Sequence, residues 1–108
     1  MSEHRRNLVY ECGQWRGDSG PRQLLACGVA VPIGLRAFEI IEVLVQSANK
    51  LVTKDELMYR IWPGATVGEN ALQVHISAIL KALDQDRAML QTVFGRGYRL
   101  IGDGWVVF

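Results

Sequence analysis

Apolar runs and turn-forming residues alternate closely over the first third of the chain. Leu8, Tyr10 and Cys12 alternate with Val9 and Glu11, which predicts a half-buried β-strand that can run on to Trp15. A segment dense in turn formers follows, and two further apolar runs, 24–27 and 29–33, are separated by Gly28. Short strands spaced this closely by turns predict an antiparallel meander at the amino-terminal end.

The period of the apolar residues changes to that of a helix near Leu35. Pro32 and Gly34 mark the change, and a polar stop follows at Asn49. Between these points apolar residues recur at spacings of three and four, which predicts an amphipathic helix that begins near Leu35. The residues that follow this spacing are Phe38, Ile41, Leu44, Val45 and Ala48.

A second, shorter helix is predicted to begin after Thr53. The Thr53 hydroxyl can accept a hydrogen bond from the backbone N–H of Glu56, and the Glu56 carboxylate can reach back in return, which is the pattern of a capping box. Pro63 and Gly64 end this helix. Its inner face is supplied by Leu57, Met58, Ile61 and Trp62.

A third and longer helix is predicted over Glu69–Leu83, and its two faces differ clearly. With about 100° between successive residues, one narrow sector collects only apolar side chains, namely Leu72, Ile76, Ile79 and Leu83. The opposite sector collects short side chains and one positive charge, namely Asn70, Val74, Ser77 and Lys81, with Gln73 and Ala78 on its flanks. The apolar sector is therefore the predicted core face, and the other sector is the predicted outward face.

The chain then folds back on itself in a predicted hairpin. The runs 90–94 and 98–101 are joined through Gly95-Arg96-Gly97, where two glycines can adopt positive φ on either side of a tight tip. A helix that can enter a major groove, followed by a hairpin with an arginine at its tip, is the arrangement of a winged-helix DNA-binding domain. The predicted fold class is α+β, with an amino-terminal antiparallel sheet, a three-helix core and a carboxy-terminal β-hairpin wing.

The size and charge of the chain set limits on this interpretation. At 108 residues, with 49% hydrophobic and 21% charged residues, it is expected to be one ordinary globular domain with a modest core. The formal net charge is only +1, from 12 basic and 11 acidic residues, whereas a nucleic-acid binder often has a strong basic excess. Any electrostatic attraction to DNA must therefore come from the local placement of cations.

Several other classes of function are disfavoured. The most apolar window is interrupted by charges and is too short to cross a bilayer, and the amino terminus lacks the apolar core of a signal peptide, so a cytoplasmic protein is expected. Cys12 and Cys27 are expected to be free thiols, with a chance contact between strands as the alternative, and the chain has no metal-site spacing. No phosphate loop, cofactor motif or nucleophile with a neighbouring base is found, which argues against an enzyme.

Taken together, these segments resemble the DNA-binding effector domain of the OmpR/PhoB-type transcriptional regulators, which include response regulators. The third helix and wing of that family are matched at 72–79 (Leu-Gln-Val-His-Ile-Ser-Ala-Ile) and at 92–100 (Thr-Val-Phe-Gly-Arg-Gly-Tyr-Arg-Leu). The second helix is matched by Thr-Lys-Asp-Glu-Leu at 53–57 with Ile-Trp at 61–62, and the start of the first helix by Gly-Leu-Arg-Ala-Phe at 34–38. The joint pattern is specific, although each motif alone is weak.

The resemblance implies a four-stranded amino-terminal sheet, a third helix that reads the major groove, and a wing over 91–101 that touches the minor groove or the backbone. The Trp-Pro-Gly-Ala sequence at 62–65 resembles a branch in which this domain stands first in a one-component regulator, whereas other members follow the receiver of a phosphorelay. The expected organisation is a flexible segment over 1–7, the winged-helix domain over 8–102, and a tail with exposed apolar residues over 103–108 that can begin a linker.

The chain departs from the common family pattern in the third helix and in the wing. Many relatives open this helix with Arg-Thr and carry further arginines along it, where this chain has Asn70-Ala71 and then Ser77, Ala78 and Leu80. Phe94 stands where an arginine usually precedes the first wing glycine. Together with the near-neutral charge, these departures favour an alternative, a winged-helix protein-interaction module with weak or no DNA affinity.

The outward face of the third helix supplies the candidate base-reading residues. Asn70 and Gln73 can each pair with two atoms of adenine, and Ser77 can hydrogen-bond either type of base. Val74 can meet a thymine methyl group. The alternative is a solvated polar face with one surface aliphatic residue, but the wing and the family pattern favour the DNA-binding interpretation.

A second set of residues is predicted to contact the DNA backbone or the minor groove. The Arg96 guanidinium, placed between two glycines, can enter a narrow minor groove, or else it is an exposed turn residue. Lys81 can contact phosphate or keep the helix end soluble, and Lys54 lies in the first turn of a helix, where backbone N–H groups favour phosphate. The indole N–H of Trp62 can reach phosphate, although an aromatic residue at a helix end is more often part of the core. Further wing contacts are predicted for Thr92, Tyr98 and Arg99.

The predicted partner is double-stranded DNA, with neither a cofactor nor a metal. The loop 63–68 matches a segment that contacts RNA polymerase in relatives, but it can equally be a connector. The resemblance also implies a homodimer on direct-repeat DNA.

His75 lies beside the apolar core stripe of the third helix. It is therefore predicted to pack and hydrogen-bond within the protein before it contacts any partner.

Overall fold

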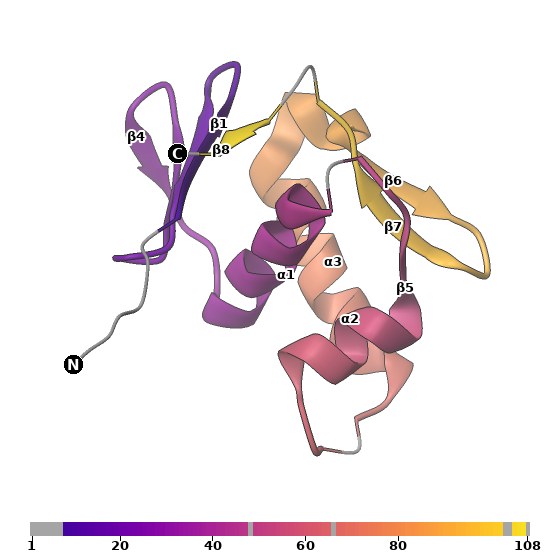
Figure 1. The fold of residues 1–108 in the computed structure, drawn as a ribbon. Helices are drawn as coiled ribbons and strands as arrows, with labels where there is room; N and C mark the ends of the chain where they lie inside the picture. Colours follow the sequence, from indigo (N-terminus) through magenta and orange to yellow (C-terminus); the bar gives the residue numbers. More distant parts are fainter. Residues whose placement is uncertain (1–7, 48, 66, 103–104, 108) are drawn as a thin grey trace.

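Two antiparallel sheets and three α-helices form the part of the chain that the computed structural model describes, residues 8–47, 49–65, 67–102 and 105–107 (Figure 1). The first sheet has the strand order β4-β3-β2-β1-β8, and the second has the order β5-β7-β6. The expected flexible segment 1–7 and Ala48 of the expected first helix lie outside the described residues. The predicted α+β winged-helix fold is confirmed.

The first sheet begins as the predicted antiparallel meander. Its strands β1, β2, β3 and β4 are Val9–Cys12, Trp15–Asp18, Gln23–Ala26 and Val29–Val31. The prediction that the first strand runs on to Trp15 is wrong, because the chain turns at Gly13, whose φ is +58°. A residue in this left-handed conformation ends the pleat, so Trp15 begins β2 directly opposite Cys12.

Residues 105–107, which lie in the segment expected to be a tail, contribute to this sheet. Strand β8 (Val106–Val107) pairs antiparallel with β1, so that Glu11 faces Val106 and Tyr10 faces Val107. The Trp105 indole packs edge-on against the Tyr10 ring, with 5.8 Å between the ring centroids. The pairing covers a strand that would otherwise leave a row of backbone groups unpaired at the edge of the sheet. The described sheet therefore has five strands, one more than the resemblance implied.

Helix α1 (Leu35–Gln46) is the centre of the core. It lies between the first sheet and the other helices (Figure 1) and contacts α2, α3 and strand β7. On the sheet side, the Phe38 ring lies 6.4 Å from the Tyr10 ring. The helix ends earlier than predicted, with Ser47 as its cap, and Asn49 follows in the left-handed conformation at φ +68°. Its buried residues are Ala37, Phe38, Ile40, Ile41, Val43, Leu44 and Val45.

Helices α2 (Lys54–Ile61) and α3 (Glu69–Leu83) pack against α1. The Thr53 hydroxyl accepts a hydrogen bond of 3.1 Å from the Glu56 backbone N–H, so this half of the predicted capping box is confirmed. The Glu56 carboxylate lies 3.5 Å from the Arg60 guanidinium instead of turning back toward the cap. The predicted core stripe of α3 is confirmed, because its buried residues are Leu72, Ile76, Ile79 and Leu83. None of the helices in the described ranges has the length and hydropathy needed to span a membrane.

The second sheet contains the wing hairpin, which follows a short 3-10 helix, η1 (Asp84–Met89). Strand β7 (Gly97–Leu100) lies between β5 (Val52–Thr53) and β6 (Leu90–Val93). Gly95 has the predicted positive φ, at +74°, but the same prediction for Gly97 is wrong. Gly97 is required for a different reason, since a Cβ there would collide with the Val52 carbonyl oxygen and lie 2.8 Å from the Thr53 Cα. The absence of a side chain lets β7 lie directly against β5.

Two buried polar atoms lack a hydrogen-bond partner among the described residues, the Tyr10 hydroxyl and the Trp105 Nε1. Tyr10 is 1% exposed, its ring lies over Gly17, and its hydroxyl finds no hydrogen-bond partner in the part of the chain that the structure describes. Burial is the main cause that raises the Tyr10 pKa far above its ordinary value, with a smaller contribution from the nearby Glu42 carboxylate. An unsatisfied buried hydroxyl opposes folding.

Replacing Tyr10 by Phe is therefore expected to raise the free energy of unfolding by about 1 kcal/mol at neutral pH. Folded Tyr10 resists ionisation, whereas the unfolded residue ionises near its usual pKa of about 10. The wild-type protein should consequently lose stability as the pH rises above about 10, and the advantage of Tyr10→Phe should grow there. Urea unfolding at neutral pH and at alkaline pH measures both effects. A loss of stability in the variant at neutral pH would show that the hydroxyl has a partner.

Candidate nucleic-acid interface

The outward face of α3 is exposed along its whole length. Every residue assigned to it from the sequence is exposed to solvent, and Val74 has 65% of its surface accessible. Helix α3 is held from behind by its buried stripe, so its outward side chains are presented on a rigid element. The structure thus confirms the two predicted faces of this helix. The exposed residues are Asn70, Gln73, Val74, Ser77, Ala78 and Lys81.

A hollow of about 310 Å³ separates the start of α3 from the wing. Lys54, Glu69 and Gln73 line it on the helical side. On the other side it is lined by the wing, which projects away from the first sheet (Figure 1). The helix and the wing therefore border a single concave surface. The wing residues that line it are Thr92, Val93, Phe94, Gly95, Gly97 and Tyr98.

An ion pair occupies the helical side of this hollow. The Lys54 Nζ donates a hydrogen bond of 2.8 Å to the Glu69 Oε2, and this bond is the main cause that raises the Lys54 pKa. Both side chains remain partly accessible, at 28% for Lys54 and 49% for Glu69. The sequence indicated Lys54 as a phosphate contact, but the structure shows that its charge is already matched by a carboxylate. A DNA phosphate would have to replace Glu69 as the partner of this ammonium group.

The other candidate cations are not neutralised in this way. Lys81 and the Arg96 guanidinium are exposed, and neither forms an ion pair within the described ranges. Arg99 donates hydrogen bonds of 3.1 and 2.9 Å from its Nε and Nη2 to the Gln91 Oε1, on the strand opposite. Since Gln91 is uncharged, this contact fixes the guanidinium in place without cancelling its charge. Lys81, Arg96 and Arg99 are thus available to an anion.

The aromatic candidates are mainly parts of the core. Tyr98 is only 5% exposed, and burial raises its pKa, so no more than its edge at the hollow can meet DNA. Trp62 is half-buried and lies 5.8 Å from the His75 ring, measured between centroids. That contact agrees with the prediction that His75 packs within the protein first. Thr92, in contrast, is exposed on the wing strand β6.

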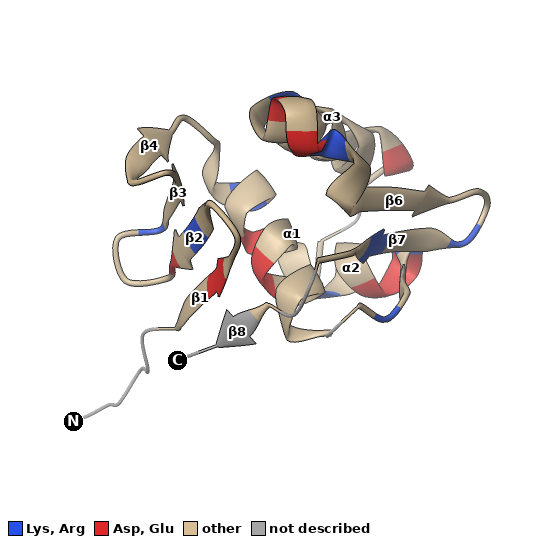
Figure 2. Cartoon of the chain, turned by 90° about the horizontal axis from the view of Figure 1, so that it is seen from above, with Lys and Arg blue, Asp and Glu red and all other residues tan. Residues whose placement is uncertain are grey.

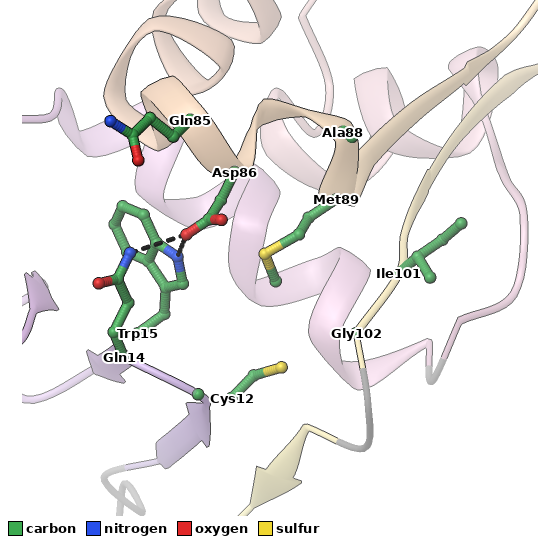
Figure 3. A pocket seen from close by; sticks show the side chains of 10 residues that line it. Cys12, Gln14, Trp15, Gln85, Asp86, Ala88, Met89, Ile101 and Gly102 are labelled. Atoms are coloured by element: carbon green, nitrogen blue, oxygen red, sulfur yellow. Dashed lines mark hydrogen bonds between the residues drawn. The ribbon is translucent and has the colours of Figure 1, made fainter.

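The wing is also connected to the first sheet at its far end. The Trp15 Nε1 and the Gln14 Nε2 both donate to the Asp86 Oδ2 of η1, at 2.8 and 2.7 Å (Figure 3). These bonds cross a hollow of about 750 Å³ between the sheet and η1. They hold the segment that leads into β6, and so help to set the direction of the wing.

Sequence reasoning missed the pairing of two residues of the interface and named a third, Phe94, only as a departure from the family pattern. Glu69 neutralises Lys54 from 15 positions further along the chain, and Gln91 holds Arg99 across the wing. Neither pairing leaves a local signal in the sequence, because both depend on how separate elements dock. Phe94 is 96% exposed and lines the hollow. An aromatic residue next to a wing glycine was the one available signal.

Lys and Arg positions alternate with Asp and Glu positions along the described part of the chain (Figure 2). The arrangement that distinguishes the interface is geometric, with a polar helix face, a basic hairpin tip and a hollow between them.

A sequence model of the family described as "Transcriptional regulatory protein, C terminal" matches residues 28–100. The chain belongs to this family of OmpR/PhoB-type DNA-binding domains.

Known members of the family share this fold at low sequence identity. The chain is 30% identical over 98 residues to the sensory transduction protein RegX3 of Mycolicibacterium smegmatis, a match that covers 87% of the chain and 43% of RegX3. The chain thus spans less than half the length of this relative. It superimposes on response regulator DrrB of Thermotoga maritima, an OmpR/PhoB homologue, with a TM-score of 0.79 at 26% identity, covering 87% of the chain and 44% of DrrB.

A third likeness is to a structure that contains DNA. The DNA-binding domain of response regulator AdeR, solved in complex with an intercistronic region, has a TM-score of 0.69 and 25% identity to the chain. The match covers 82% of the chain and 94% of that domain.

The wing glycines offer a test of how the interface is assembled. Ala at Gly97 would force β7 away from β5, so Gly97→Ala should lower the free energy of unfolding by about 2 to 3 kcal/mol. Gly95 has positive φ but open space around it, so the matched control Gly95→Ala should lose only about 1 kcal/mol. Chemical unfolding of both variants gives the comparison. If Gly97→Ala proved no more harmful than Gly95→Ala, the close packing of the wing on β5 would be wrong.

Proposed function

We propose that this domain binds a specific double-stranded DNA sequence, with α3 in the major groove and the wing, residues 91–101, at the minor groove or the backbone. The observation that carries the proposal is a single hollow lined by Gln73 of the exposed face of α3 and by the wing residues Gly95 and Gly97, between which Arg96 is exposed. An α-helix such as α3 is about 10 to 12 Å across with its side chains and so fits a major groove, which is about 12 Å wide. Membership of a family of DNA-binding domains supports the same function.

The roles of the individual side chains follow from their positions. Asn70 and Gln73, in the first turns of α3, are proposed to pair with adenine edges, and Ser77 to bond a further base one turn on. Val74, which is 65% exposed, is proposed to contact a thymine methyl group. Phosphates are proposed to be contacted by Lys81, Arg99, Thr92, the polar edges of Trp62 and Tyr98, and Lys54 once a phosphate has displaced Glu69.

The rest of the regulator is inferred from the family. The exposed loop residues around Pro63 and Gly64 support a contact of segment 63–68 with RNA polymerase, and the domain is proposed to form a homodimer on direct repeats. A cytoplasmic location follows from a DNA target. Whether the domain stands first in a one-component regulator or follows a receiver remains a prediction from the resemblance.

A second candidate function is a protein-interaction module on the same scaffold. The observation that favours it is the pairing of Lys54 with Glu69, which removes one cation from a surface that already has few. The two functions differ in their response to salt. Specific and non-specific DNA binding both weaken as counterions compete for the phosphates, whereas an apolar protein contact does not.

Selection of bound fragments from a genomic pool, followed by a salt titration on the recovered sequence, tests the proposal. With about four phosphate contacts, log affinity should fall with log salt at a slope of about −4. Arg96→Ala should weaken binding to all sequences and make the slope shallower by about one, whereas Gln73→Ala should change the sequences recovered. Arg16→Ala, which removes an exposed arginine from the first sheet, is the matched control. A slope near zero for the wild type would favour the interaction module.

Removing the carboxylate that competes for Lys54 should strengthen DNA binding. Glu69→Gln is expected to raise affinity several-fold and to make the salt slope steeper by about one, because Lys54 becomes available to a phosphate. Glu11→Gln alters the net charge equally, but on the first sheet, and should have little effect. If Glu69→Gln weakened binding instead, Glu69 would itself be a base-reading residue, since a carboxylate can accept a hydrogen bond from cytosine.

A further inference from the structure

Phe94 is the most exposed large hydrophobic residue in the described part of the chain, with 96% of its surface accessible. A single exposed apolar side chain on a protein surface requires no explanation by itself. The position of Phe94 in the wing, however, does require an explanation. Phe94 is the first residue of the wing turn, lies two residues from Arg96, and borders the hollow that Gln73 lines from the side of α3.

The wing holds Phe94 in place and does not let it collapse onto the protein. At the tip, the Arg96 carbonyl accepts a hydrogen bond of 3.2 Å from the Lys54 backbone N–H, and the Arg96 N–H donates one of 2.9 Å to the Val93 carbonyl. Behind the tip, Arg99 is bonded to Gln91 across the two strands. The phenyl ring is therefore presented on a fixed hairpin, and its contact with a ligand would cost little ordering of the backbone.

We propose that Phe94 inserts its ring into the DNA minor groove at a base step that opens easily, and that it thereby adds sequence preference at the wing. This proposal rests on the proposed function. Minor-groove proteins use apolar side chains, Phe among them, as wedges between partly unstacked bases. Pyrimidine–purine steps unstack most readily, so the preference would be for steps such as TA or CA.

The surroundings favour a duplex as the occupant of this surface. The backbone ridge that separates a major groove from the next minor groove would lie in the hollow, between Gln73 and Phe94. Arg96, two residues further along the same turn, brings a positive charge to a groove whose potential is negative. Phe94 stands on the wing side of the hollow, so with α3 in the major groove its ring faces the minor groove. The wing would then combine one electrostatic contact with one apolar contact.

The test compares the 108-residue wild-type chain with Phe94→Ala in selections from a pool of random duplexes. Both proteins should recover the same major-groove motif, but only the wild type should enrich a pyrimidine–purine step about half a helical turn away. On the wild-type sequence, Phe94→Ala should weaken binding roughly tenfold, the size expected for loss of one base–aromatic contact. Its salt slope should be unchanged because no charge is removed, in contrast to Arg96→Ala.

Two further measurements make the outcome specific. 2-Aminopurine placed at the enriched step should become more fluorescent when the wild type binds, and should not when Phe94→Ala binds. Phe94→Leu keeps an apolar side chain and should retain part of the step preference. If Phe94→Ala recovers the same step with the same affinity, the proposal is overturned while DNA binding stands. If the wild type recovers no motif and shows no dependence on salt, the proposed function has failed, and the role of Phe94 in DNA binding fails with it.

Discussion

The pairing of β7 with β5 is the constraint on which the interface depends. Strand β5 runs straight into α2, so the position of β7 against it fixes the wing relative to the helices. The contact is possible because Gly97 has no side chain, and the bond from the Lys54 N–H to the Arg96 carbonyl continues it to the tip. At its other end the wing is anchored through η1, by the bonds from Gln14 and Trp15 to Asp86. A shift of either anchor would change the width of the hollow.

The core explains why a polar, nearly neutral surface can still present one precise shape. Helix α1 is buried on most of its circumference, so the first sheet and the two outer helices pack on the same rigid element. Helix α3 contributes only one narrow stripe to that core and leaves the rest of its surface for other contacts. Its outward residues therefore have little effect on stability. Surface substitutions of this kind usually change stability by less than about 0.5 kcal/mol, which leaves the recognition face able to vary independently of the fold.

Much of the fold could be predicted from the sequence, because its elements leave local signals. The spacing of the apolar residues predicted both ends of α3 correctly. The Thr53 hydroxyl predicted the start of α2. The features that could not be predicted depend on contacts between distant segments. Strand β8 exists only because β1 offers it an edge, and Lys54 meets Glu69 only after two helices dock. The role of Gly97 was missed for the same reason, since the residue that demands a glycine lies on another strand.

The scarcity of cations changes how specificity can arise in this domain. Phosphate contacts are shared by all sequences, so each additional arginine strengthens non-specific and specific binding together. Here the first turn of α3 has the uncharged Asn70, Lys54 is paired with Glu69, and the uncharged Phe94 stands in the wing turn, where the family resemblance implies an arginine. Each of these features lowers the electrostatic attraction to DNA of any sequence. Hydrogen bonds to bases and the shape of the groove are then left to discriminate among sequences. The quantity that decides occupancy in a genome is the ratio of specific to non-specific affinity. A domain with few unpaired cations at its interface can keep this ratio high at modest affinity. Base contacts and groove shape must then supply the free energy of specific binding that phosphate contacts do not.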